Sequence, residues 1–163
     1  MSIQHPLAYF ITWTVYGTFL QGDKRWWRRR GGAAQPPAPR LQEWHADRLK
    51  HEIVLLSESH REVVSTEIAR LSEFRGWHLW VANPRTNHVH VVVTAKSHDG
   101  MRVRDQLKAN CTRVLRETDN VFVDRPAWTV GGDVEFLDSE DDLESAVLYA
   151  GEAQDRKGRD QIL

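Results

Sequence analysis

Residues 87–95 read NHVHVVVTA, and the rest of the fold can be worked out from this stretch. Its β-branched residues favour a strand. Side chains two apart on a strand share a face, so His88 and His90 should stand side by side while Val89 and Val91 enter the core. Neutral imidazoles bind divalent metal ions, which makes the pair candidate metal ligands. The alternative is two solvated histidines on an exposed sheet face.

Three further segments have the composition of strands. Residues 77–82 are β-prone and reach the histidine stretch through Asn83 to Asn87, so a hairpin is the simplest connection. Residues 7–15 are rich in aromatic and β-branched side chains and predict a buried strand. Residues 128–137 predict a strand pair or a strand with a glycine turn.

Two helices are expected between these strands. Residues 57–74 place apolar side chains at helical spacing behind Ser57 or Ser59 as the N-cap. Ser97 or Asp99 is expected to start the next helix, whose apolar stripe comprises Val103, Leu107, Cys111, Val114 and Leu115.

A last helix is expected behind Ser139, which with Asp142 resembles a capping box. The resulting order β-α-β-β-α-β-α predicts an α+β fold: a ferredoxin-like split βαβ antiparallel sheet with helices on one face and an extra C-terminal helix. A chain of 163 residues fits one domain over 1–163, because a single core commonly organises roughly 100–200 residues.

Composition excludes several classes of protein. The single Cys111 cannot form an internal disulfide or a CxxC zinc site. No apolar stretch approaches the roughly 20 residues that a membrane helix needs, and no signal peptide is apparent, so a cytoplasmic protein is expected. The 22 Lys and Arg against 23 Asp and Glu argue against a uniformly basic DNA-coating protein.

The charges are nevertheless segregated along the chain. Residues 23–40 hold six cations and one acid, whereas residues 133–144 hold seven acids and no cation. The Gly, Ala and Pro content predicts a basic loop at about 21–50. Its cluster of aromatic and basic residues could stack unpaired bases and hold phosphates, or the tryptophans could dock onto the domain; the cluster comprises Trp26, Trp27, Arg28, Arg29 and Arg30.

The final helix offers a reactive side chain. Tyr149 beside a metal-bound phosphate is a plausible covalent nucleophile, although a tyrosine in this context is more often a half-buried packing residue. Glu152 lies close to the same helix face, while Gln154 is turned away unless the helix ends at Gly151.

Four stretches together resemble the single-tyrosine HUH transposases of small insertion sequences and their REP-associated relatives. They are YFITWTVYGTFLQGDKR (9–25), NHVHVVVTA (87–95), QLKANCTRVLRE (106–117) and WTVGGDVEFLDSEDDLESAVLYAGEAQ (128–154). The resemblance implies that His88 and His90 bind Mg²⁺ or Mn²⁺ and that Tyr149 attacks single-stranded DNA near hairpin ends. It also implies a 5′-phosphotyrosine intermediate, a homodimer, and no nucleotide cofactor.

The chain departs from the family pattern at the third metal ligand. The family's Gln or Asn position one turn after the tyrosine is Ala153 here. Gln154 is preferred as the ligand on residue type, with Glu152 as the rival. Lys108 matches the family's lysine-bearing helix, where it could contact DNA phosphate; a solvated surface lysine is the alternative.

The expected function is therefore a metal-dependent DNA transposase and endonuclease acting at the nucleoid of a bacterial or archaeal cell. The alternative is a domesticated protein of the same fold that binds DNA hairpins with little or no cleavage. A phosphodiesterase acting on small nucleotides is disfavoured, because such enzymes generally carry a second His motif.

Overall fold

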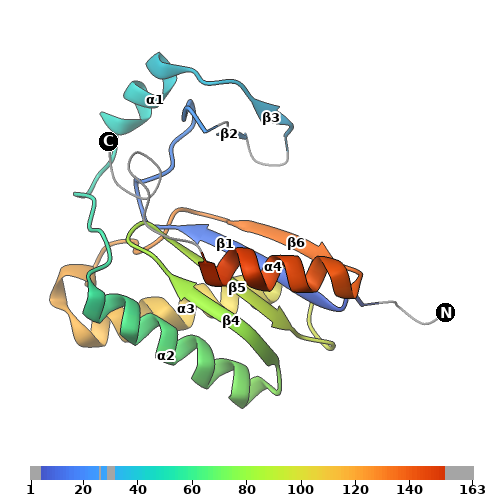
Figure 1. Cartoon of the computed structure of the whole chain (residues 1–163). Helices are drawn as coiled ribbons and strands as arrows, with labels where there is room; N and C mark the ends of the chain where they lie inside the picture. Colours follow the sequence, from blue (N-terminus) through green and yellow to red (C-terminus); the bar gives the residue numbers. More distant parts are fainter. Residues whose placement is uncertain (1–4, 26, 29–31, 153–163) are drawn as a thin grey trace.

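A four-stranded antiparallel sheet forms the centre of the protein (Figure 1). The computed structural model describes residues 5–25, 27–28 and 32–152. The strands are β1 (Ala8–Thr14), β4 (His78–Pro84), β5 (His88–Thr94) and β6 (Asp133–Leu137), in the spatial order β4-β5-β1-β6. Each neighbouring pair is antiparallel, so β1 and β4 run parallel with β5 between them.

Three helices connect and cover these strands. Helix α2 (Glu58–Arg75) links β1 to β4, α3 (Gly100–Thr118) and the short η1 (Asn120–Phe122) link β5 to β6, and α4 (Glu140–Glu152) follows β6. A βαβ unit split by the intervening β5 is the ferredoxin-like arrangement, so the predicted α+β fold is confirmed. In the described part of the chain, no helix is both long enough and apolar enough to span a bilayer.

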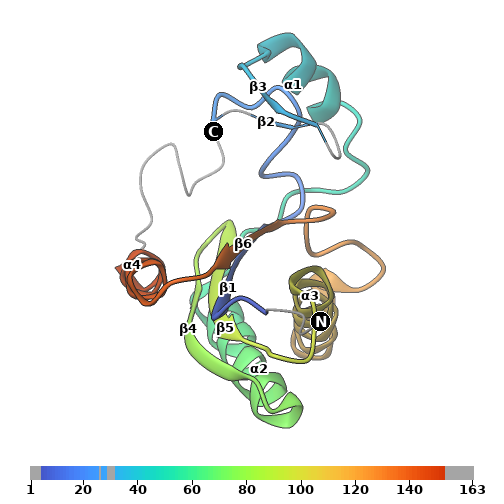
Figure 2. The same cartoon turned by 90° about the vertical axis from the view of Figure 1, so that its right-hand side faces the viewer.

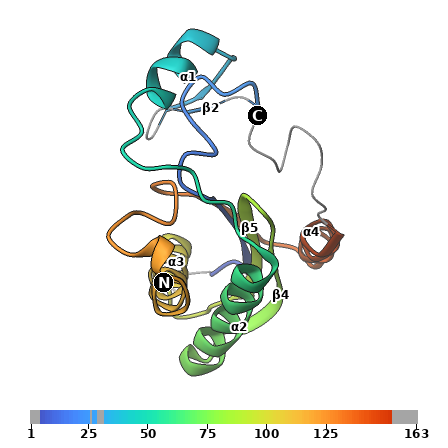
Figure 3. The same cartoon turned by 90° about the vertical axis from the view of Figure 1, so that its left-hand side faces the viewer.

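The two faces of the sheet are covered by different helices (Figures 2 and 3). On one face, alternate residues of β1 and β5 pack against α2 and α3, among them Ile11, Trp13, Val89, Val91 and Val93. On the other face, a smaller cluster packs under α4, and it contains Ala8, Val92, Leu137 and Ala150. Because His88 and His90 alternate with Val89, Val91 and Val93, they share the α4 face with Val92.

Side-chain caps fix where the helices begin. Ser57 caps α2, since its hydroxyl accepts the backbone N–H of His60 and the His60 ring accepts the N–H of Ser57. Asp99 caps α3 by accepting two backbone N–H groups, and Ser139 accepts the N–H of Asp142 at the start of α4. Of the N-caps expected from the sequence, Ser57 and not Ser59 starts α2, and Asp99 and not Ser97 starts α3.

Residues 21–50, called the arm below, contain secondary structure where the sequence predicts a loop. They contain the short pair β2 (Trp27–Arg28) and β3 (Ala34–Gln35) and the helix α1 (Pro39–Ala46). Pro39 suits the first turn of a helix, where its missing N–H is not needed. Gly22, at φ +95°, lets its carbonyl accept the Ala38 N–H. In all three views the arm lies beyond the end of the sheet where β1 finishes.

Candidate functional site

The two histidines of β5 lie side by side on the sheet face that α4 crosses. Their ring centroids are 4.5 Å apart, and the strand register pairs His90 with Thr12 and His88 with Thr14 of β1. His90 is buried, with 6% of its surface exposed, whereas His88 is partly exposed. The pair therefore has one sheltered and one more accessible ring.

A neighbouring polar side chain orients each ring. The Nδ1 atom of His88 donates to the Asn87 amide oxygen at 2.9 Å. Because that oxygen can only accept, the proton of the neutral ring sits on Nδ1 and the lone pair on Nε2. The Nδ1 atom of His90 lies 2.9 Å from the Thr12 hydroxyl. Such contacts hold imidazoles in the orientation and tautomer that metal ligation requires.

Helix α4 brings Tyr149 to the same face. Its ring centroid lies 5.8 Å from that of His90 and 6.0 Å from that of Phe10. Phe10 is itself 5.4 Å from His90, so three elements contribute to one aromatic cluster. Tyr149 remains 49% exposed, so its phenol is accessible from solvent.

The other two tyrosines are engaged elsewhere. The Tyr9 hydroxyl donates to the His98 carbonyl at 2.9 Å, and burial, followed by the nearby charge of Asp99, raises its pKa. The Tyr16 hydroxyl accepts the backbone N–H of Lys50 at 3.1 Å. Of the three tyrosines, all in the described residues, Tyr149 is the one whose ring adjoins the histidine pair.

The donor set fits part of a divalent metal site. His88 and His90 supply two imidazoles from one strand, oriented by Asn87 and Thr12. Within residues 5–152 as described, no three His, Cys, Asp or Glu side chains are grouped closely enough to hold an ion. The preferred third ligand, Gln154, lies outside the described residues; its rival Glu152 is the exposed last residue of α4.

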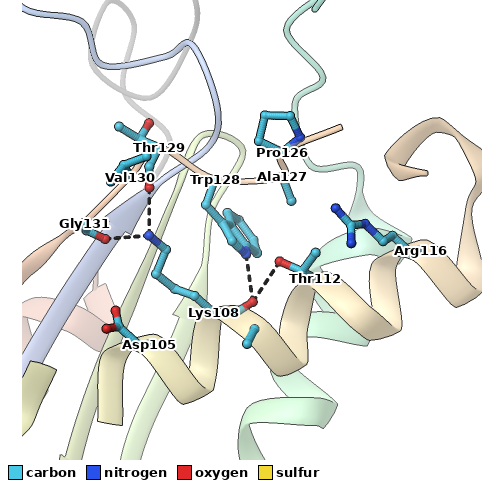
Figure 4. Close-up of a pocket in the computed structure, with 11 residues that line it drawn as sticks. Asp105, Lys108, Thr112, Arg116, Pro126, Ala127, Trp128, Thr129, Val130 and Gly131 are labelled. Atoms are coloured by element: carbon cyan, nitrogen blue, oxygen red, sulfur yellow. Dashed lines mark hydrogen bonds between the residues drawn. The ribbon is translucent and has the colours of Figure 1, made fainter. Parts of the chain in front are cut away.

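Lys108 belongs to α3, which packs on the face of the sheet opposite the histidines, and its side chain points toward the loop before β6 (Figure 4). Its ammonium donates to the carbonyl oxygens of Thr129 and Gly131 at 2.7 and 2.6 Å. Burial, followed by repulsion from Arg104, lowers the pKa of Lys108 to about 8. It lines an open pocket of about 390 Å³ between α3 and the loop before β6. In this structure Lys108 fastens that loop, and its contact with DNA stays a prediction.

The predicted DNA-binding cluster of the arm is described only in part. Trp27 is buried, and its Nε1 donates to the Pro36 carbonyl at 2.8 Å, so this tryptophan packs within the arm. The other members of the cluster, Trp26, Arg29 and Arg30 together with the side chain of Arg28, lie outside the described residues.

Sequence reasoning missed the polar residues that support the site. Asn87 precedes the histidine pair directly, and this adjacency was the available signal. Thr12 carried no such signal, because its partnership with His90 depends on the register between β1 and β5. Asn83, whose side chain bonds to the Ala150 carbonyl at 2.7 Å, was assigned only to a turn.

Comparisons with known proteins are informative about the fold. No family model matches the chain, and no curated protein matches it with significant similarity. Among solved structures, it is similar to a protein described as a "putative transposase" from Deinococcus radiodurans R1, with a TM-score of 0.54 and 12% identity. The likeness covers 91% of this chain and 92% of the other. At this identity it shows a shared fold over nearly the full length of both chains.

Proposed function

We propose that this protein is a metal-dependent transposase that cleaves and rejoins single-stranded DNA through Tyr149. The observation that carries the proposal is the approach of Tyr149 on α4 to His90 on β5, with ring centroids 5.8 Å apart. A nucleophile next to a histidine pair is what the single-tyrosine HUH transposases require, and four stretches of the sequence resemble them. The shared fold with the Deinococcus radiodurans protein is compatible with this proposal.

His88 and His90 would hold Mg²⁺ or Mn²⁺, with Gln154 as the preferred third ligand, because the rival Glu152 is not grouped with the pair in the described residues. A bound divalent ion polarises a phosphoryl oxygen and stabilises the negative charge that develops on it. Thr12 and Asn87 keep the two rings in place, so the site is oriented before DNA binds.

The Tyr149 oxygen attacks the scissile phosphorus, forming a phosphotyrosine bond as the bond from phosphorus to the 3′-oxygen breaks. The phenol loses its proton, and the departing 3′-oxygen gains one, so protons balance. The downstream strand stays attached through its 5′-phosphate. Attack by another strand's 3′-hydroxyl reverses the step and conserves the bond energy, so no nucleotide cofactor is consumed.

The proposed substrate is single-stranded DNA with hairpin ends, in the cytoplasm of a bacterial or archaeal cell. A homodimer is the proposed assembly, in which the tyrosine helix of one subunit could serve its own site or that of its partner. Lys108 and the arginines at positions 28–30 are proposed to contact phosphates.

The second candidate function is hairpin binding without cleavage. It is favoured by one observation: in the part of the chain that the structure describes, no third carboxylate, thiolate or imidazole joins His88 and His90. A site with two protein ligands would bind the ion weakly, and the protein would then act by holding DNA.

The test is incubation of single-stranded hairpin DNA, labelled at its 3′ end, with the protein and Mn²⁺, followed by a denaturing gel. We expect a covalent band with the wild type and with the control Tyr16→Phe, and none with Tyr149→Phe. A 5′ label should leave with the released fragment. A band that persists in Tyr149→Phe excludes Tyr149 as nucleophile, and binding without a band supports the second candidate.

A further inference from the structure

An exposed tryptophan stands on helix α1 of the arm. Trp44 is 49% exposed, and the guanidinium of Arg48, one turn later, lies over its ring at 3.7 Å from the centroid. The Arg48 side chain also donates to the Trp44 carbonyl at 2.9 Å, which fixes it in this position. The guanidinium therefore places a positive charge against one face of the tryptophan ring.

The charge of the arm selects an anionic partner. Residues 21–50 contain eight Lys and Arg and three Asp and Glu. One of these acids, Asp23, is buried and ion-paired with Arg25 at 2.8 Å, so this pair adds little net charge of either sign to the surface, and seven cations and two acids remain. Exposed cations of the described arm include Lys24, Arg40 and Lys50. A polyanion is the chemically matched ligand.

The arm starts beside the histidine pair. At its root, the Val15 N–H and the Thr18 hydroxyl donate to the carbonyl of Asn87, at 2.8 and 3.3 Å. Asn87 directly precedes His88, and Figures 1 to 3 place the arm beyond this end of the sheet. A DNA strand bound at the histidines can therefore continue along the arm.

We propose that the arm is a second contact surface for single-stranded DNA, with Trp44 as the stacking platform for an unpaired base. Arg48 holds the ring from one face and the base stacks on the other, while the exposed cations Lys24, Arg40 and Lys50 neutralise flanking phosphates. Stacking on an aromatic ring suits unpaired bases, because bases in a duplex are already stacked on their neighbours. The choice of DNA as the polyanion rests on the proposed function.

The chain offers a matched control at the other end of the sheet. Phe74, at the end of α2, is 72% exposed, and the guanidinium of Arg75 lies 5.5 Å from its ring centroid. It is also an exposed aromatic ring with a neighbouring arginine, but α2 leads into the start of β4, far from His88. A general effect of removing an exposed ring would appear in both Trp44→Ala and Phe74→Ala.

The test is fluorescence anisotropy with a labelled oligothymidine in EDTA, where no metal-dependent cleavage occurs. We expect Trp44→Ala to weaken binding by roughly 5- to 100-fold, the usual effect of losing one stacked base. Trp44→Phe should retain most of the affinity, and Phe74→Ala should match the wild type. Arg40→Gln, which removes one of the exposed cations assigned to phosphates, should reduce the slope of log affinity against log salt by about 0.7, as expected for one lost phosphate contact on a single strand.

Two results would overturn this inference. One is a Trp44→Ala protein that is folded by circular dichroism and binds oligothymidine as tightly as Phe74→Ala. The other is unchanged DNA affinity with altered self-association in sedimentation, which would make Trp44 a protein-docking residue. Failure of the proposed function is a separate result, because it appears as a missing covalent band and leaves the binding measurement intact.

Discussion

The side-chain amide of Asn83 donates a hydrogen bond of 2.7 Å to the backbone carbonyl of Ala150. Asn83 lies on β4 directly opposite His90 in the sheet register, and Ala150 is the buried residue that follows Tyr149. One side chain therefore fastens the tyrosine helix to the sheet next to the histidine pair. The position of Tyr149 depends on this bond as well as on apolar packing under α4.

We expect Asn83→Ala to loosen the last turns of α4 while the rest of the fold stays intact. Loss of a hydrogen bond worth about 1 kcal/mol should accelerate local amide hydrogen exchange roughly 5-fold. Exchange measured by mass spectrometry over residues 140–152 checks this. Asn110→Ala is the control, because the Asn110 amide also bonds a helix carbonyl, that of Gln106, but on α3. Equal exchange of α4 in both variants would contradict this role for Asn83.

Thr12→Val should weaken metal binding. The substitution removes the hydroxyl that lies 2.9 Å from His90 Nδ1 but keeps the shape of the side chain. Losing a residue that orients a metal-bound histidine commonly costs about 10- to 100-fold in metal affinity. Mn²⁺ titration followed by electron paramagnetic resonance measures it without any DNA. Thr112→Val, on α3, should bind Mn²⁺ as the wild type does, and equal affinity of all three proteins would contradict the prediction.

Lys108→Met should destabilise the fold by roughly 1–3 kcal/mol in the free energy of unfolding. The ammonium holds the Thr129 and Gly131 carbonyls, and methionine leaves both oxygens without this donor. Urea denaturation measures the change, with the exposed Lys96→Met as control. If the two variants are equally stable, Lys108 has no structural role, and its interpretation as a phosphate contact gains support.

The pair formed by His60 and Asp119 predicts a pH dependence of stability. Hydrogen bonds from the Val121 N–H and the His60 ring lower the pKa of Asp119, so its ionised form is favoured in the folded state. The contribution is therefore fully present above the ordinary aspartate pKa of about 3.9 and is lost as pH falls through the lower folded value.

The difference in the free energy of unfolding between wild type and Asp119→Ala should be smaller below about pH 4 than at about pH 5, because the contribution of the Asp119 carboxylate is lost there. Thermal or urea unfolding across this range measures it, with the exposed Asp138→Ala as control. If the difference in the free energy of unfolding stays constant at lower pH, Asp119 acts only through packing.

The sequence was sufficient to predict the sheet because its signals are local. The alternation through His88–Thr94 and the helical spacing behind Ser57 each report on a few neighbouring residues, and their order permits few topologies. The arm was misassigned because its Gly and Pro content resembles a loop. The conformation of the arm depends on contacts such as the hydrogen bond from the Ala38 N–H to the Gly22 carbonyl, and such contacts leave no periodic pattern in the sequence.

The site was predictable only for residues that carry reactive groups. His88, His90 and Tyr149 stood out by chemistry, but the supporting contacts of Thr12 and Asn83 join residues far apart in the chain. Such contacts follow from register and from where α4 crosses the sheet. The ring contact of Tyr149 with His90 gives a reason to choose this tyrosine that is independent of its place in the final helix.

The central claim is that Tyr149 becomes covalently joined to DNA, and peptide mass spectrometry of the nuclease-treated adduct tests it most directly. After incubation with Mn²⁺ and single-stranded hairpin DNA, we expect the peptide containing Tyr149 to carry a nucleotide linked through its 5′-phosphate. The peptides containing Tyr9 and Tyr16 should be unmodified. A nucleotide on either of those tyrosines, or no modified peptide from a protein that binds both the metal and the DNA, would contradict the claim.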